Sequence, residues 1–379
     1  MIIEVKLQEI FYLFKYFQFK GAPINGHPRG PELIGLIEEV LLKYGLPMEH
    51  DYERIFIEMD YHSEWSAEVC QEAIDNLERS QSEYKAGQTQ FKSTLVIPKS
   101  PLQHGAVYLA FKLPLDYIDF MNKISDVLMK NMILYQFLWK TKDIWCRDFM
   151  PVPLSKDKFV QFIYDPDYLK GKWSNMKTDP WEVNEGLDYS PLRSELVIDG
   201  GNVIRFGKTV IMTEKIFAEN PKWTKPDLLK QISNELEVEK VVIIPFELED
   251  YTGHADGMVR FVGEDAVIIN DYQSKDGYTK GFITALRKAL ESKGITIAGT
   301  LPYRSFPRRN KDGDYTAIGC YMNYLEIGNL IVFPKFEIEE DTEAHTKIQQ
   351  YFPTKKVVQL DCREIAEDGG VLNCITWTI

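Results

Sequence analysis

Cysteine is scarce in this sequence. Of its 379 residues only five are cysteines, Cys70, Cys146, Cys320, Cys362 and Cys374. Their number is odd and no two of them are spaced as CxxC, so neither a disulfide framework nor a zinc site is indicated. A reducing compartment fits this pattern best, and we expect a cytoplasmic protein that needs no metal and no other cofactor.

Long apolar runs and an excess of positive charge are also lacking. Residues 1–20 are rich in apolar and aromatic side chains, but they are interrupted by Glu4, Lys6, Glu9 and Lys15. A signal peptide or membrane span needs a cleaner apolar stretch, so no membrane partner is expected. Lysine and arginine number 44 against 57 aspartates and glutamates, a formal charge of −13. That balance argues against a nucleic-acid partner and favours a cationic ligand.

What the sequence does contain is a recurring landmark: a short polar or glycine-containing motif followed by a strand-like apolar run. Its positions, marked by Asp148, Gly200, Gly253, Gly319 and Gly369, lie 52, 53, 66 and 50 residues apart. Recurrence at this spacing indicates an internal repeat of five units. Hydrophobic residues make up 44% of the chain, enough for a large core,. We therefore expect one domain over residues 1–379, with residues 1–50 as a divergent N-terminal segment.

Three units share one order of elements, a hairpin, then a helix, then a strand. Hairpins are predicted at 202–213, 258–270 and 324–334, where apolar runs flank a tight turn,. Helices are predicted at 226–237, 279–293 and 342–351, and strands at 241–245, 295–298 and 357–360,. The C-terminal strand that carries Cys374 opens a further unit, which we expect the N-terminal third to complete with its helices at 31–44, 67–79 and 115–129. The predicted class is α/β.

One unit departs from this order. Between its hairpin and its last strand, residues 166–193 are rich in Tyr, Trp, Pro, Gly and Asp instead of forming an amphipathic helix. A long irregular insertion in a compact repeat is either a functional flap or a divergent surface loop, and the sequence does not separate the two.

Landmark residues of successive repeats meet near one axis when the repeats close into a ring. Each has an ordinary structural explanation when taken alone. Together they supply a thiol nucleophile, a histidine that moves protons near neutral pH, and two carboxylates that hold a planar cation by charge-assisted hydrogen bonds. This set suits attack on a guanidinium carbon. Its candidate members are Asp148, His254, Asp256, Asn323 and Cys374.

Four motifs in the same order resemble those of the agmatine deiminase and Porphyromonas-type bacterial peptidylarginine deiminase family. They are Trp145-x-Arg147-Asp148, Asp199-Gly200-Gly201-Asn202, Gly253-His254-x-Asp256, and Gly369-Gly370-x3-Cys374. The resemblance covers the chain from Trp145 to its end. It implies the pentein fold, a five-bladed pseudo-symmetric α/β propeller, and a hydrolase that converts a guanidinium to a ureido group with release of ammonia.

The resemblance also implies roles. Cys374 attacks the guanidinium carbon to form a covalent thiouronium, and His254 protonates the departing ammonia and then activates water. Asp148 and Asp256 hold the guanidinium nitrogens. Trp145, Asn323, Asp250 and Arg147 are the other expected substrate-site residues, with Trp145 as an apolar wall. Around them, without substrate contact, we expect Asp199, Gly200, Gly201, Asn202 and Gly370.

Some positions depart from the family motifs. Phe149, Met150, Asn373 and Trp377 replace residues that the resemblance places beside the substrate stem or the thiol, which bears on substrate identity and not on the reaction. Agmatine, giving N-carbamoylputrescine, is the leading substrate. Peptidyl-arginine or another arginine derivative, giving citrulline, is the first alternative, and an amidinotransferase or a non-catalytic binding propeller are the others. The expected partner is a small cationic guanidino compound, and a homodimer is compatible with the sequence.

Overall fold

The computed structural model describes residues 106–131, 133–185, 187, 189–247, 250–272, 276–303 and 315–379. The chain divides into two units, Met1–Pro101 and Leu102–Ile379, and the described residues belong to the second. The helices expected at 31–44 and 67–79, the segment 1–50 and Cys70 lie outside them. The single domain over 1–379 therefore stays a prediction.

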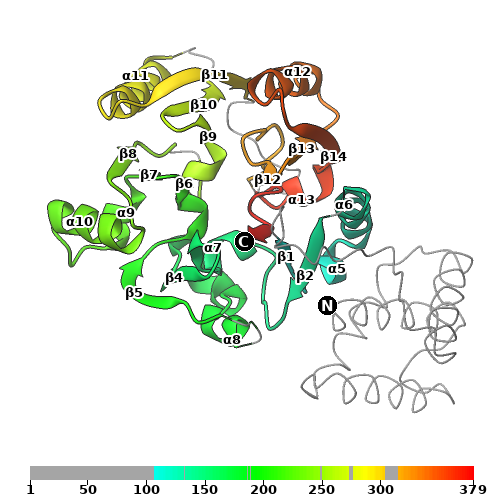
Figure 1. Ribbon diagram of the computed structural model, residues 1–379, viewed down its shortest axis with the longest axis horizontal. Helices are drawn as coiled ribbons and strands as arrows, with labels where there is room; N and C mark the ends of the chain where they lie inside the picture. Colours follow the sequence, from blue (N-terminus) through cyan, green and yellow to red (C-terminus); the bar gives the residue numbers. More distant parts are fainter. Residues whose placement is uncertain are drawn as a thin grey trace, which may run out of the picture. The chain divides into compact units, whose positions relative to one another are not determined.

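The described residues form five three-stranded sheets arranged around a common centre (Figure 1). In each sheet, an antiparallel pair is followed by a third strand parallel to the second. Four sheets take their strands from one stretch of chain: β3 Val152–Ser155, β4 Lys158–Ile163 and β5 Leu192–Val197; β6 Ile204–Phe206, β7 Thr209–Thr213 and β8 Lys240–Ile244; β9 Val259–Gly263, β10 Ala266–Asp271 and β11 Thr296–Pro302; β12 Leu325–Ile327, β13 Leu330–Lys335 and β14 Lys356–Asp361.

The fifth sheet joins the two ends of this region. Strand β15 (Thr376–Thr378) pairs antiparallel with β1 (Ala106–Ala110), which pairs in parallel with β2 (Leu134–Leu138). The prediction that the C-terminal segment opens a unit completed by an earlier part of the chain is confirmed. Cys374 itself lies in the turn before β15 and not in the strand. This closure fixes the nucleophile candidate at the centre of the ring.

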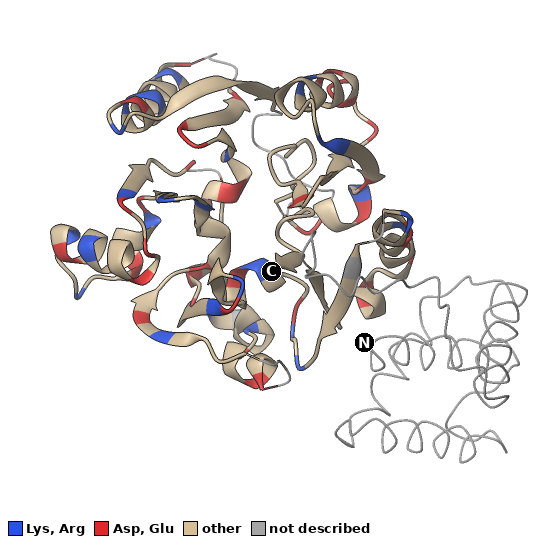
Figure 2. Cartoon of the chain, viewed as in Figure 1, with Lys and Arg blue, Asp and Glu red and all other residues tan. Residues whose placement is uncertain are grey.

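Helices connect the parallel strands, because such strands need a crossover. They are α5 Leu113–Asp116, α6 Ile118–Lys130, α9 Lys215–Glu219, α10 Lys225–Glu235, α11 Gly277–Glu291 and α12 Asp341–Tyr351. Helix α13 (Arg363–Ala366) instead follows β14 and leads to the next sheet. In α10 the side chain of Thr224 accepts a hydrogen bond from the Asp227 amide at the N-terminus, and Leu228 and Ile232 are fully buried,. Figure 2 shows that charges of both signs lie on these outer helices.

The insertion at 166–193 contains short helices instead of the long helix found in the other units. They are η1 Asp167–Leu169, η2 Gly171–Met176 and α8 Pro180–Asn184. The sequence prediction placed the end of the insertion at residue 193, but β5 already begins at Leu192. Alternation of buried and exposed side chains is weak at the start of β5, because Leu192 and Arg193 are both exposed. The first residues of this strand could therefore not be predicted from the sequence.

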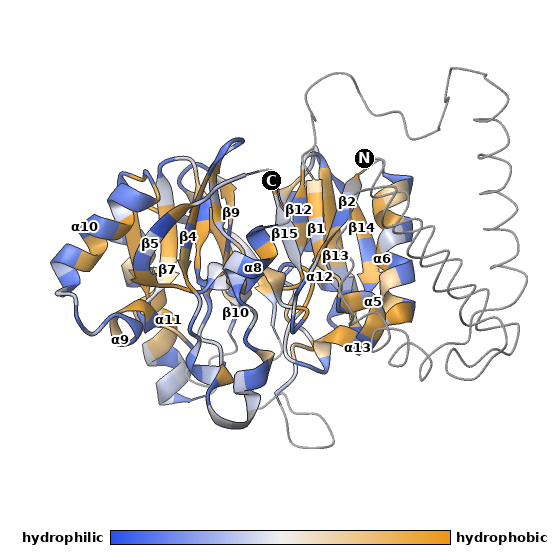
Figure 3. Ribbon diagram, turned by 90° about the horizontal axis from the view of Figure 1, so that it is seen from below, coloured by the Kyte–Doolittle hydropathy of each residue, from blue (hydrophilic) through white to orange (hydrophobic). Residues whose placement is uncertain are grey.

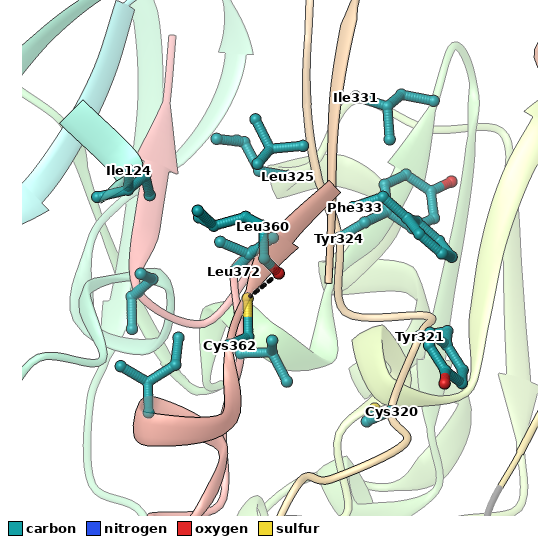
Figure 4. Close-up of a cluster of buried hydrophobic side chains, with 14 of the residues drawn as sticks. Ile124, Cys320, Tyr321, Tyr324, Leu325, Ile331, Phe333, Leu360, Cys362 and Leu372 are labelled. Atoms are coloured by element: carbon teal, nitrogen blue, oxygen red, sulfur yellow. Dashed lines mark hydrogen bonds between the residues drawn. The ribbon is translucent and has the colours of Figure 1, made fainter. Parts of the chain in front are cut away.

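Strands are the most apolar part of the fold, and the helices turn their polar faces outward (Figure 3). Figure 4 shows part of the core, in which Leu325, Ile331 and Phe333 of one sheet and Ile124 of α6 belong to one cluster of buried side chains. Cys362 lies among these side chains, its thiol donates to the carbonyl oxygen of Leu360 at 3.3 Å, and burial raises its pKa well above the usual range. This cysteine is therefore a core residue. Among the described helices, none has the length and apolar character that crossing a membrane requires.

Candidate active site

Five turns at the centre of the ring carry the residues singled out from the sequence. Each turn precedes the first strand of one sheet, so the repeat brings equivalent positions together. Helix α7 (Cys146–Phe149) carries Asp148, η3 (Gly200–Asn202) follows Asp199, and η4 (Ala255–Gly257) carries Asp256 directly after His254. Asn323 precedes β12 and Cys374 precedes β15. Helix α7 contacts both η3 and β15, and η3 contacts η4, which places these turns side by side.

Asn323 holds the turn that carries Cys374. Its side-chain Nδ2 donates to the Cys374 Sγ at 3.1 Å and to Oδ2 of Asp256 at 2.9 Å. Its Oδ1 accepts from the backbone amides of Asn373 at 3.0 Å and Cys374 at 3.2 Å. The thiol is also 3.6 Å from Oδ2 of Asp256. One amide side chain thus fixes both the sulfur and the adjacent carboxylate.

His254 lies between two carboxylates. Its Nε2 donates to Oδ2 of Asp199 at 3.0 Å, and its Nδ1 is 3.5 Å from Oδ1 of Asp148. Burial disfavours the charged imidazole, but the Asp148 charge and the Asp199 hydrogen bond outweigh it and raise the pKa of His254 to about 9,. Burial opposes ionisation of Asp199 too, yet His254 and Lys215 keep the pKa of that carboxyl below its ordinary value. At neutral pH the pair is an imidazolium and a carboxylate.

Asp256 lies beside the thiol, and Asp148 lies beside the imidazole. Burial raises the pKa of Asp148 to about 6, against the opposing charge of His254 and with the support of the Asp199 and Asp256 charges. Burial and then the charges of Asp256 and Asp148 raise the pKa of the Cys374 thiol well above its usual range. Of the two, Asp256 has an oxygen in contact with the sulfur. Cys374 and His254, which both lie in the described part, make no direct hydrogen bond with each other.

Glycine is required where the chain approaches these side chains most closely. A Cβ on Gly201 would lie 2.5 Å from Oδ1 of Asp148 and 2.6 Å from Nδ1 of His254, and one on Gly200 would lie 2.0 Å from the Arg147 carbonyl oxygen. The Gly201 amide also donates to Oδ1 of Asp148 at 3.0 Å. The two glycines of the Asp-Gly-Gly motif therefore let the carboxylate and the imidazole meet.

Residues 97–379 match the sequence model of the Porphyromonas-type peptidyl-arginine deiminase family. The chain belongs to this family. Agmatine deiminase from Pseudomonas aeruginosa is 25% identical over 273 residues, an alignment that covers 62% of this chain and 73% of that protein. A Streptococcus mutans protein with the provisional name agmatine deiminase is 27% identical over 304 residues, with 69% of this chain and 80% of that protein covered.

A solved structure supports the same fold. Agmatine deiminase of Enterococcus faecalis superposes on this chain with a TM-score of 0.56 at 17% sequence identity, over 73% of this chain and 93% of that one. The predicted family and the five-bladed α/β pentein fold are confirmed. At this identity the likeness to the solved structure concerns the fold, so the roles of single residues in this deiminase family member rest on their own geometry.

Trp145 lies against the segment that leads to Cys374, and its role as a wall of the substrate site stays a prediction. Its ring packs on Gly370, where a Cβ would lie 2.3 Å from the indole. Next to it Gly369 has a φ of +92°, a conformation that favours glycine, and packs on Tyr251,. The Gly369-Gly370 pair thus lets two aromatic rings close on the chain that leads to Cys374.

Three other residues predicted for the site form hydrogen bonds within the protein. Arg147 donates from Nε to the Asn373 carbonyl oxygen at 3.3 Å, so it supports the turn before Cys374. Asn202 accepts from the Thr213 amide at 2.9 Å and joins η3 to β7. Oδ1 of Asp250 accepts from the amide and hydroxyl of Thr252, two residues before His254. Substrate contacts of Arg147 and Asp250 stay predictions.

Two of the departures from the family motifs point away from the thiol. Phe149 and Trp377 are buried in an apolar cluster, and Nε1 of Trp377 donates to the Pro151 carbonyl oxygen at 2.7 Å. The expectation that they lie beside the substrate or the thiol is wrong, because Trp377 belongs to β15, whose buried residues pack into the blade. Asn373 does lie at the site, where its Nδ2 donates to Oδ2 of Asp256 at 2.7 Å.

Two residues of the site were not named from the sequence. Lys215, at the start of α9, lies 3.0 Å from Oδ2 of Asp199. Tyr168, in η1 of the insertion, donates its hydroxyl to Oδ2 of Asp148 at 3.1 Å, and its ring contacts those of His254 and Tyr251. The contacts of Tyr168 with Asp148 and His254 support the interpretation of the insertion as a functional flap. A signal for Tyr168 existed in the aromatic content of the insertion, whereas Lys215 had none.

Proposed function

We propose that this protein is a cysteine-dependent deiminase that hydrolyses the guanidinium of a small substrate to a ureido group and releases ammonia. Agmatine, giving N-carbamoylputrescine, is the proposed substrate, supported by the agmatine deiminases among its relatives. One observation carries the proposal: Oδ2 of Asp256 lies 3.6 Å from the Cys374 thiol, and His254 stands beside Asp148 with its other nitrogen tied to Asp199. A planar cation between the aspartates would present its carbon to sulfur.

Substrate binding supplies the electrostatic change that the thiol needs. In the free protein burial, and then the charges of Asp256 and Asp148, hold the pKa of Cys374 high, so sulfur is protonated at neutral pH. A guanidinium that bridges Asp148 and Asp256 offsets one of their two negative charges and places a cation next to sulfur, which favours loss of the thiol proton to water. The Asn323 amide then stabilises the thiolate by its hydrogen bond to Sγ. The nucleophile is thereby formed only when substrate is present.

The following steps use His254. The thiolate adds to the guanidinium carbon, and the imidazolium gives the proton on Nδ1 to a departing nitrogen, so that the C–N bond breaks, ammonia leaves and a thiouronium remains. The neutral imidazole then removes a proton from water, and hydroxide adds to the carbon. The C–S bond breaks as the added hydroxyl gives its proton to sulfur, which returns the Cys374 thiol and the ureido product. Nδ1 is the nitrogen for both transfers, since Nε2 is held by Asp199,.

Direct product analysis separates this proposal from its alternatives. Purified protein is incubated with agmatine, arginine, an arginine-containing peptide and a longer guanidino amine, and both ureido product and free ammonia are measured. We expect ureido formation, highest with agmatine, that is lost in Cys374→Ala while circular dichroism is unchanged. Ammonia release without any added amine excludes an amidinotransferase. Equal turnover by Cys374→Ala would exclude the cysteine from the mechanism. Preference for the peptide would indicate a peptidyl-arginine deiminase instead.

A cytoplasmic location, a homodimer and the lack of nucleic-acid or cofactor partners stay predictions.

A further inference from the structure

Lys215 is a buried cation next to the histidine. It is the first residue of α9, its side chain is 8% exposed, and its Nζ lies 3.0 Å from Oδ2 of Asp199. The same oxygen accepts from Nε2 of His254, also at 3.0 Å, while Oδ1 of Asp199 has no hydrogen-bond partner among the described residues. Lysine and imidazole therefore share one carboxylate oxygen.

Three carboxylates from different elements hold this lysine in place. Nζ lies 3.3 Å from Asp167 in η1 and 2.9 Å from Glu219 one turn along α9, in addition to Asp199. Burial disfavours its charge, but these carboxylates outweigh burial and raise the pKa of Lys215 above its usual range. An unpaired ammonium would be costly in this position, so the fold has been built to keep a fixed positive charge here.

The charges that face His254 explain why such a cation is useful. Carboxylates of Asp148 in α7 and Asp199 before η3 stabilise the imidazolium, and the ring of Tyr168 in η1 lies against the imidazole. Lys215 is the opposing charge, and it acts to lower the pKa of His254. A proton held by two carboxylates alone is harder to pass to a leaving nitrogen, because a weaker acid transfers its proton more slowly.

We propose that Lys215 is a positioning residue for His254 that acts through Asp199. By donating to Oδ2 it orients the carboxylate that holds Nε2, and its charge limits how strongly that carboxylate retains the imidazole proton. Asp167 attaches the insertion to the same lysine, so the first turn of the insertion adjusts the charge that reaches Asp199. This inference rests on the proposed role of His254 as proton donor.

Titration of His254 tests the inference without any assay of activity. The histidine signals of the ¹⁵N-labelled protein are followed with pH by NMR, and the His254 signal is identified as the one missing from His254→Gln. We expect Lys215→Met to raise the pKa of His254 by about one unit, as removal of a nearby charge does, and Lys215→Arg to leave it within a few tenths of the wild-type value. An unchanged or lowered pKa in a folded Lys215→Met protein overturns the inference.

Asp167→Asn provides a second test with the opposite sign. The side chain of Asp167 is 60% exposed, so its replacement leaves the core unchanged. Without the Asp167 charge, the positive charge of Lys215 acts more strongly on Asp199. We expect the pKa of His254 to fall. Asp165→Asn is the matched control, because it breaks the exposed ion pair with Lys177 in the same segment and leaves His254 unaffected. If Lys215→Met does not fold, a pKa in Asp167→Asn that equals the control overturns the inference.

Kinetics connect this coupling to the reaction. With a substrate that the wild type turns over, Lys215→Met should lower kcat about tenfold or more with little change in KM, and Lys215→Arg should restore most of the loss. Wild-type protein that releases ammonia from no guanidino compound would contradict the proposed function and leave the titration result standing. If Lys215→Met shifts the pKa of His254 in the NMR titration but leaves kcat unchanged, the positioning role is contradicted.

Discussion

The side-chain Nδ2 of Asn323 lies 3.1 Å from the sulfur of Cys374, and the same nitrogen donates to Asp256. We expect Asn323→Asp to lower kcat by roughly 10²–10³, the usual cost of a lost donor to a developing anion, because an oxygen would face sulfur in place of an N–H. The added charge also disfavours the thiolate. Steady-state kinetics with agmatine measure this loss.

Asn220 offers a matched control for that change. It is buried, and its Nδ2 donates to the carbonyl oxygens of Val197 and Ile216, away from the central turns. Asn220→Asp should lower the melting temperature and leave kcat near the wild-type value. If both variants lose activity in proportion to their stability, the contact between Asn323 and sulfur has no catalytic importance.

Asp148 and Asp256 should each be needed for substrate binding. Asp148→Asn or Asp256→Asn leaves one edge of a buried guanidinium without its charged acceptor, a loss of about 3–5 kcal/mol for a broken buried pair. We expect kcat/KM to fall by about 10² or more, as measured with agmatine. Asp341→Asn is the control, since this buried carboxylate accepts from Tyr321 and from backbone amides in the core. Unchanged kinetics in both site variants would exclude the carboxylate clamp.

The five-fold repeat is the reason that much of the site was predictable. Asp148, His254, Asp256, Asn323 and Cys374 are far apart in sequence, yet each precedes the first strand of a repeat, so closing the ring brings them together. Strand and helix positions after residue 200 followed from apolar periodicity for the same reason, because every unit repeats one pattern.

Contacts that depend on tertiary packing were not predictable. Lys215 begins an amphipathic helix, where a lysine is usually solvated, and nothing in its neighbourhood indicates an ion pair with Asp199. The insertion has no periodicity, so its sequence could not single out Tyr168 from the other aromatic residues. Trp377 was placed beside the thiol by motif position alone, whereas the direction of its side chain is set by the strand in which it lies,.

Gly201 should tolerate no side chain. Its absent Cβ is what allows Oδ1 of Asp148 and Nδ1 of His254 to approach, at 2.5 and 2.6 Å from the position that a Cβ would take. Gly201→Ala should therefore move both groups and lower kcat/KM by about 10² or more, an effect that a small misplacement of reacting groups produces. Gly281→Ala, in α11, meets no atom within 4 Å and should raise stability by up to about 1 kcal/mol,. Full activity in Gly201→Ala would show that the three residues do not form one unit.

Tyr168 should orient Asp148 through a single hydroxyl. Tyr168→Phe removes the 3.1 Å hydrogen bond to Oδ2 and keeps the ring that contacts His254 and Tyr251. We expect KM for agmatine to rise about three- to tenfold, because a carboxylate that has lost one net hydrogen bond of about 1 kcal/mol is held less firmly. Tyr189→Phe, which loses a hydroxyl bond to Asn184 in the same insertion, is the control. Equal KM values in the two variants would show that the Tyr168 hydroxyl does not contribute to substrate binding.

The pH dependence of kcat/KM should report the protons that the free enzyme must lose before it reacts. Asp148, with its pKa raised to about 6, must be ionised to bind the cation. Between that value and about 9, His254 is already the required imidazolium, but the Cys374 thiol still has to lose one proton. We therefore expect log kcat/KM to rise steeply below about pH 6, to continue rising with unit slope, and to level off near pH 9, where His254 in the free enzyme loses its own proton. Alkylation of Cys374 by iodoacetamide should increase over the same range. A flat profile from pH 6 to 9 would mean that the thiolate is present before substrate binds, and the role assigned to the substrate in forming it would be wrong.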